Sequence, residues 1–319
     1  QDENGHIPIQ TAVQHVESVK YVPLLAERAI QRKIGGPERG GLLLPYTRED
    51  PECNILQYLV TSVHDEASTW YDESCIQALK DLFRARLLNI KDCILFNLIG
   101  YASATECLQR LEYLTETFSN ALATPVPLPV PLPIPLGKNY PIHFGNYCDS
   151  VDIDVFATLL KAGMRHYPES FGFMFKQNTY GERAINQAIE KFGKDDVFQC
   201  IRSVISPPEE YPILHHVIRY TPDLFDDFFY RYPDGLYLKD RRGRLLLHVA
   251  LKSGLKLSPS LMMMIHSNKE CIEVRDPVTN LYPFMLAATS GRKKDLTTIY
   301  KMISLRPEMI SKCLGIGEA

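Results

Sequence analysis

The sequence predicts an all-α fold, an α-solenoid of about eight degenerate repeats with short β-turn or hairpin tips. Three observations support this: a phrase that recurs along the chain, turns that precede it, and amphipathic helical patterns that follow it. The clearest copies of the phrase are YPIH (140–143), LLHVA (246–250) and YPFMLAA (282–288), with a fourth, IPIQTAV, at 7–13. A phrase repeated tens of residues apart indicates stacked modules, and such arrays bind other molecules on an extended surface.

Each copy of the phrase contains one polar position, which follows an apolar anchor. The anchors lie at residues 9, 56, 96, 142, 185, 214, 247 and 284. The polar position is occupied by Gln10, Gln57, Asn97, His143, Asn186, His215 and His248, and by Met285 in the last copy. Because nearly all of these side chains can form hydrogen bonds, we expect this position, the repeat slot, to have a structural role in each module.

Short turns with a left-handed residue precede several copies of the phrase. DENG (2–5) and DRRG (240–243) have the form Asp-x-x-Gly, and NTYG (178–181) nearly does. The segment DPVTN (276–280) is one residue longer and ends in Asn. Glycine and, after it, asparagine tolerate the positive φ of a tight turn, so each segment predicts a turn immediately before a helix.

A second helix is predicted after each phrase. In residues 155–163 apolar side chains recur with helical spacing and a glycine closes the pattern. Comparable patterns lie at 19–30, 75–88, 107–118, 197–205, 261–265 and 296–303. Ser258-Pro259 and Thr221-Pro222 are typical helix starts, with a hydroxyl residue as N-cap and proline at the first helical position.

Together, the turn, the phrase and the second helix resemble the ankyrin repeat, whose first helix begins with Thr-Pro-Leu-His-x-Ala. The resemblance covers nearly the whole chain, with the strongest motifs at both ends. The modules of the first half exceed the usual ankyrin length, so the chain is most similar to divergent, long-repeat ankyrin-like proteins. The alternative is a solenoid of the HEAT or armadillo type, whose units are about 40–47 residues long but lack the Asp-x-x-Gly turn.

A proline-rich segment divides the predicted repeats into two groups. About three degenerate repeats are expected in 1–122 and about five in 140–319. Between them, at 123–139, Pro125 to Pro135 alternate proline with Val, Leu or Ile, which predicts an extended polyproline II run. We expect a strap packed on the repeats; a flexible linker and a ligand for a partner remain alternatives.

Composition sets the remaining limits. The net charge is −3, but residues 1–230 carry 20 basic and 30 acidic side chains, and residues 231–319 carry 15 and 8. The basic C-terminal end predicts a protein partner with an acidic surface. The eight scattered cysteines predict buried free thiols and an intracellular, reducing compartment, the cytoplasm or nucleus, with an organelle left open because the N-terminus looks truncated. No apolar run is long enough to span a membrane.

No catalytic, nucleotide-binding or metal-binding motif is present, so an enzyme, a cofactor and a metal site are not expected. The basic excess is too small to predict nucleic-acid binding. The resemblance instead implies a non-catalytic scaffold or adaptor, which binds its partner through the hairpin tips and the concave face. A subunit of a larger assembly and the regulatory domain of an enzyme are the alternatives. The candidate partner-binding residues are Asn4, His6, Tyr180, Arg241, Arg242, Arg244, Asn280 and Tyr282.

Overall fold

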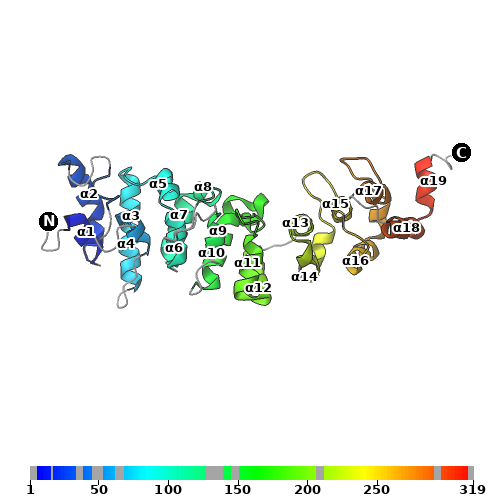
Figure 1. Ribbon diagram of the computed structural model, residues 1–319, viewed down its shortest axis with the longest axis horizontal. Coiled ribbons are helices and arrows are strands. Elements are labelled where there is room, and N and C mark those ends of the chain that lie inside the picture. Colours follow the sequence, from blue (N-terminus) through cyan, green and yellow to red (C-terminus); the bar gives the residue numbers. More distant parts are fainter. Residues whose placement is uncertain are drawn as a thin grey trace. The chain divides into compact units, whose positions relative to one another are not determined.

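The computed structural model describes residues 6–15, 17–33, 39–44, 53–61, 68–105, 107–126, 139–144, 151–205, 212–290 and 296–314. Among these residues the regular elements are helices, and strand pairing is limited to isolated β-bridges. The predicted all-α class is therefore confirmed. The chain forms two compact units, Gln1–Val204 and Ile205–Ala319, which run from blue to green and from yellow to red in Figure 1.

In the first unit, one series of short helices is packed in chain order. Each member contacts the next along the series. Its members are α1 (Pro8–Val13), α3 (Ile55–Thr61), α6 (Leu98–Ala104), α9 (Pro141–Phe144) and α11 (Ala184–Phe192). These are the helices that contain or adjoin the recurring phrase, and most of their apolar residues are buried.

A second series of longer helices accompanies the first, and again each member contacts the next. It consists of α2 (Val22–Gln31), α4 (Ser68–Arg84), α7 (Leu108–Thr117), α10 (Ile153–His166) and α12 (Lys194–Val204). Each of these helices also packs against the first-series helix that precedes it, so the unit is built of helix pairs (Figure 1). The short elements η1 (Val19–Tyr21), α5 (Ile90–Leu95), α8 (Ser119–Leu122) and η2 (Pro168–Phe173) lie between them.

The second unit repeats this pairing. Helices α13 (Ile213–Tyr220), α15 (Leu246–Lys252) and α17 (Pro283–Thr289) contact one another in order. Their partners are α14 (Phe225–Arg231), α16 (Pro259–Ser267) and α18 (Leu296–Leu305), and α19 (Glu308–Leu314) follows. The short 3-10 helices η4 (Pro222–Leu224), η5 (Pro233–Leu236) and η6 (Lys269–Ile272) flank second helices.

Local sequence explains where these helices begin. Pro8, Pro141 and Pro283 occupy the first helical position of α1, α9 and α17, where the missing N–H is not needed. At α16 the Ser258 hydroxyl accepts the Leu261 N–H at 3.2 Å, as its N-cap position predicts. Every second helix predicted from the sequence overlaps a helix of the structure.

A buried arginine joins three helices of the first unit. Arg110 of α7 is 1% exposed, and its Nε donates to Asp72 of α4 at 2.7 Å. Its Nη1 donates to the Leu59 carbonyl of α3 at 3.1 Å, and the guanidinium lies over the Tyr71 ring. A buried charge needs such partners, so Arg110 fixes the packing of these helices.

The third copy of the phrase has a different register from the one predicted. Asn97 was expected at the repeat slot, inside the first helix, but it is the N-cap of α6. Its backbone is left-handed, with φ 49°, and its side chain accepts the Gly100 N–H at 3.2 Å. A Cβ at Gly100 would lie 2.5 Å from the Asn97 side chain, so this cap requires glycine at position 100. Phe96 is consequently not inside the helix.

The predicted end of α10 is also corrected. Gly163 was expected to close the helix, but α10 continues to His166. A Cβ on Gly163 would lie 2.7 Å from Cα of Gly172, in η2. Glycine at this position therefore permits close packing of two backbones, not helix termination.

The proline-rich segment does not coincide with the division between the compact units. Val126 and Asn139 form an antiparallel bridge, in which each N–H donates to the other carbonyl at 2.8 Å. Helices on both sides of it pack together, α6 with α9 and α7 with α10, so 140–204 belongs to the first unit. Residues 127–138, with most of the predicted strap, lie outside the described residues.

Candidate functional site

The side chains at the repeat slot connect one helix pair to the next. Gln57 Oε1 accepts the Asn54 N–H at 2.9 Å, and its Nε2 donates to the Phe96 carbonyl at 3.2 Å. His248 makes the same two bonds, with Nδ1 accepting from Leu245 at 3.2 Å and Nε2 at 2.9 Å from the Val274 carbonyl. Because Nδ1 of His248 accepts an N–H, its ring proton must be on Nε2.

The other slot residues differ in their exposure to solvent. Gln10 accepts the Ile7 N–H at 2.9 Å, and Nε2 of the buried His215 lies 3.1 Å from the Arg244 carbonyl. His143 is buried as well, with Nδ1 3.2 Å from the Tyr140 carbonyl. Asn186 is different because it is exposed. In the part of the chain that the structure describes, no three His, Cys, Asp or Glu side chains converge as metal ligands would.

Asp240 organises the turn that precedes α15. Its Oδ1 accepts the N–H groups of Arg242 and Arg244 at 2.9 and 3.0 Å. Its Oδ2 accepts guanidinium N–H groups from Arg244 at 2.8 Å and from Arg219 at 2.7 Å. Burial alone would raise the pKa of Asp240, but these hydrogen bonds outweigh it and lower the pKa to about 2. Gly243 completes the turn at φ 75°.

This geometry corrects the role expected for Arg244. The residue was a candidate for contact with a partner, but it is only 5% exposed and its guanidinium is paired with Asp240. The side chain therefore holds the turn together. Arg241 and Arg242, the other two arginines of the turn, are exposed, as is Lys239 before them.

The next turn, which precedes α17, has the same organisation. The buried Asp276 accepts the N–H of Thr279 at 3.2 Å and its hydroxyl at 2.7 Å. Burial would raise the pKa of Asp276, but the bonds from Thr279 and Val278 outweigh it and lower the pKa. Asn280 has φ 59°, the left-handed conformation that its position predicts.

Arg275 and Tyr282 lie at the base of this second turn. The Arg275 guanidinium carbon is 4.3 Å from the centre of the Tyr282 ring, and Nη1 donates to the Asn280 carbonyl at 3.2 Å. Arg275 is exposed and Tyr282 is half-buried. The two turns adjoin, because a Cβ at Gly243 would lie 3.6 Å from Cγ of Pro277.

One turn of the first unit is built like these two. Asn178, in place of aspartate, accepts the N–H groups of Tyr180 and Glu182, each at 2.9 Å. Gly181 follows at φ 81°, and Tyr180 is 54% exposed. His6, before α1, is half-buried. Asn4 and the rest of the predicted turn at 2–5 lie outside the described residues.

No model of a known protein family matches this chain, and neither does any curated protein sequence. A functional proposal for the chain therefore rests on its own side chains. The described residues also contain no helix with the length and apolar character needed to cross a membrane.

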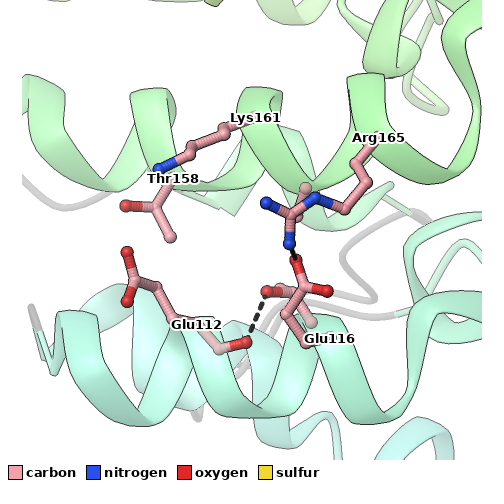
Figure 2. Close-up of a pocket in the computed structure, with 7 residues that line it drawn as sticks. Glu112, Glu116, Thr158, Lys161 and Arg165 are labelled. Carbon is pink, nitrogen blue, oxygen red and sulfur yellow. Dashed lines mark hydrogen bonds and ion pairs between the residues drawn. The ribbon is translucent and has the colours of Figure 1, made fainter.

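A shallow charged depression lies between α7 and α10 of the first unit, with a volume of about 130 Å³. Figure 2 shows Glu112 and Glu116 of α7 facing Thr158, Lys161 and Arg165 of α10. Arg165 Nη1 is 2.5 Å from Glu116 Oε1, so an ion pair crosses the depression. This depression was not predicted from the sequence, although the two acids, and likewise the two bases, are four residues apart, a spacing that places each pair on one helix face.

The described cysteines are free, and most of them are buried. Burial raises the pKa of Cys75 and Cys200 to about 11, and that of Cys93 and Cys271 to about 12. These thiols are therefore protonated at neutral pH and serve as small apolar core residues. Cys148 lies outside the described residues.

Proposed function

We propose that this chain is a non-catalytic protein-binding scaffold of ankyrin-like repeats, each a turn followed by two antiparallel helices. The order of contacts supports the repeat architecture, because first helices pack on first helices in both units, and second helices pack on second helices in the first unit. The repeat slot supports it as well, since Gln57 and His248 make equivalent bonds to the following module. In this proposal the partner contacts the turns that precede the first helices.

The observation that carries the proposal is that each turn combines one residue that fixes its shape with exposed residues that vary between turns. The first residue, Asn178, Asp240 or Asp276, accepts hydrogen bonds from the turn and fixes its shape. The residues between are exposed and differ from turn to turn, with Tyr180 in one and Arg241 and Arg242 in another. A constant framework that displays variable side chains is suited to recognition of a specific protein surface, where Tyr and Arg are frequent hot spots.

A subunit of a larger assembly is the second candidate function. Helix α18 exposes two large apolar side chains four residues apart, Leu296 at 70% and Tyr300 at 74%. Residues at this spacing lie on one helix face, which a neighbouring subunit would cover. For either function we propose an intracellular, reducing environment, because the described cysteines are free thiols.

Site-specific photo-crosslinking of the intact chain in cells tests this function. A photoreactive phenylalanine derivative is placed at Tyr180 or Arg242, on the turns, and at Glu190 or Lys252, which are exposed on helices. We expect one protein partner to cross-link at the turn positions with roughly fivefold or higher yield than at the helix positions, as for a central hot spot against its surroundings. Equal yields at all four positions would contradict binding through the turns. The same derivative placed at Tyr300 tests the second candidate, and cross-links confined to this position would favour it.

A further inference from the structure

We propose that the two adjoining turns of the second unit, 239–244 and 274–282, form a binding site for an acidic peptide segment of a partner protein. Arg241, Arg242 and Arg275 contact the carboxylates of that segment. This inference rests on the proposed function, because it names the chemistry of the partner. From here on, these two turns are called the basic turn pair.

The exposed charge of the basic turn pair is positive. The basic turn pair contains five basic residues and two acidic ones, Asp240 and Asp276. Both carboxylates are buried and fully engaged in hydrogen bonds inside their turns. One base, Arg244, is buried with them. The charges that remain exposed are all positive, on Lys239, Arg241, Arg242 and Arg275.

The Arg275 side chain is held in a fixed position. Its guanidinium lies over the Tyr282 ring and donates to the Asn280 carbonyl, so the side chain is already ordered before a partner binds. An ordered, exposed guanidinium loses less conformational entropy when it forms a paired hydrogen bond with a carboxylate. Arg275 is therefore a preformed anion-binding group beside the exposed charges of the neighbouring turn.

The two turns of the basic turn pair form one surface. Gly243 of the first turn adjoins Pro277 of the second, so one extended peptide reaches both. The His248 Nε2 donates to the Val274 carbonyl, directly before Arg275, and links the helix that follows the first turn to the base of the second. The relative positions of the cations on both turns are thus set by the fold.

The chemistry of the site favours a peptide over a nucleic acid. Proteins that bind nucleic acid tightly neutralise about six to ten phosphates, more than the four exposed cations here. Binding of single strands also needs open aromatic faces for base stacking, but Arg275 covers the face of Tyr282. Four cations match a short run of glutamates or aspartates instead.

Fluorescence anisotropy with the intact chain tests this inference. The probe is a labelled peptide of alternating glutamate and serine, compared with the glutamine–serine peptide and with an oligothymidine of the same length. At about 50 mM NaCl, where exposed charges interact across the turns, we expect the glutamate peptide to bind most tightly. We expect Arg241→Glu/Arg242→Glu, and separately Arg275→Glu, to raise its Kd by roughly tenfold or more, because each removes a charge-assisted contact and adds a repulsion.

The matched control is Lys252→Glu/Lys256→Glu, which makes the same charge change at exposed positions at the other end of α15. This variant is expected to raise the Kd less than about threefold, as a remote charge does. Equal weakening by both double variants, or tighter binding of the oligothymidine, would overturn the inference. If the peptide does not bind while cross-links persist at Tyr180 and Arg242, this inference fails and the proposed function stands. Loss of those cross-links would contradict the proposed function itself.

Discussion

Gln57 in the first unit and His248 in the second make the same pair of hydrogen bonds with different chemical groups. Each accepts the N–H three residues before it and donates to a carbonyl of the next module, 39 residues away for Gln57 and 26 for His248. The repeat slot thus requires one acceptor and one donor at fixed positions, which either a carboxamide or a neutral imidazole supplies. Only the imidazole can gain a proton, so the module that contains Gln57 and the module that contains His248 should respond differently to acid.

The largest loss of stability is expected on removal of the Asp240 carboxylate, which holds the turn before α15. Asp240→Ala removes the acceptor of two turn N–H groups and leaves the buried Arg244 without its carboxylate. We expect hydrogen exchange at α13 and α15 to report a loss of about 3–5 kcal/mol of local stability, the cost of breaking a buried pair. Asp234→Ala, at an exposed position of the same unit, is the control and should change stability by less than about 0.5 kcal/mol. Similar losses in both variants would contradict the role of Asp240.

The stability of the second unit is expected to fall at acidic pH. Burial lowers the pKa of His215 and of His216 to about 4, from the 6.5 of an exposed histidine. The unfolded chain therefore takes up protons between pH 6.5 and 4 that the folded unit excludes. Stability of the second unit should be complete above pH 6.5 and fall towards pH 4, by roughly 2–3 kcal/mol from His215 alone. Asp240, with its pKa of about 2, adds a further loss only below about pH 4.

Hydrogen exchange, corrected for its intrinsic pH dependence, measures the loss of local stability at acidic pH in each unit of the intact chain. Peptides from α13 and α15 should lose protection at pH 5, while those from α3 and α6 should keep it. Reciprocal substitution tests the role of the slot side chain directly. His248→Gln should reduce the loss of protection at pH 5 in α15, and Gln57→His should introduce such a loss in α3. Burial lowers the pKa of His248, and Gln57 is only 8% exposed, so the exchanged side chains meet similar surroundings. An acid response that follows the unit and not the histidine would refute the explanation.

The smallest effect is expected at the bridge of the first unit. Val126 and Asn139 are already paired, as Lys239 and Leu245 are around the tight turn of the second unit. Replacement of residues 127–138 by Asn-Gly, a two-residue hairpin turn, should lower the Tm slightly, because the predicted strap would lose its apolar contacts with the helices. An unchanged or higher Tm on calorimetry would instead favour the flexible linker, because a shorter linker costs less closure entropy. A deletion that also removes Val126 and Asn139 is the control and should lower the Tm.

The sequence by itself determined the local features. Proline at positions 8, 141 and 283 marks helix starts, and Gly243 and Asn280 mark left-handed turn residues, because each depends on the backbone of a few consecutive residues. The all-α class followed from the same signals. The slot residues that hydrogen-bond across modules were also recognisable, since their recurrence is visible without coordinates.

Only the tertiary structure decided burial, register and proximity. Nothing adjacent in sequence distinguishes Arg244 from Arg241 and Arg242, yet the first is buried against Asp240 and the others are exposed. The packing of Gly163 on Gly172 and the charged depression between α7 and α10 depend on contacts between separate helical elements. Local backbone preference is a property of neighbouring residues, whereas exposure and charge pairing depend on which distant surfaces pack together.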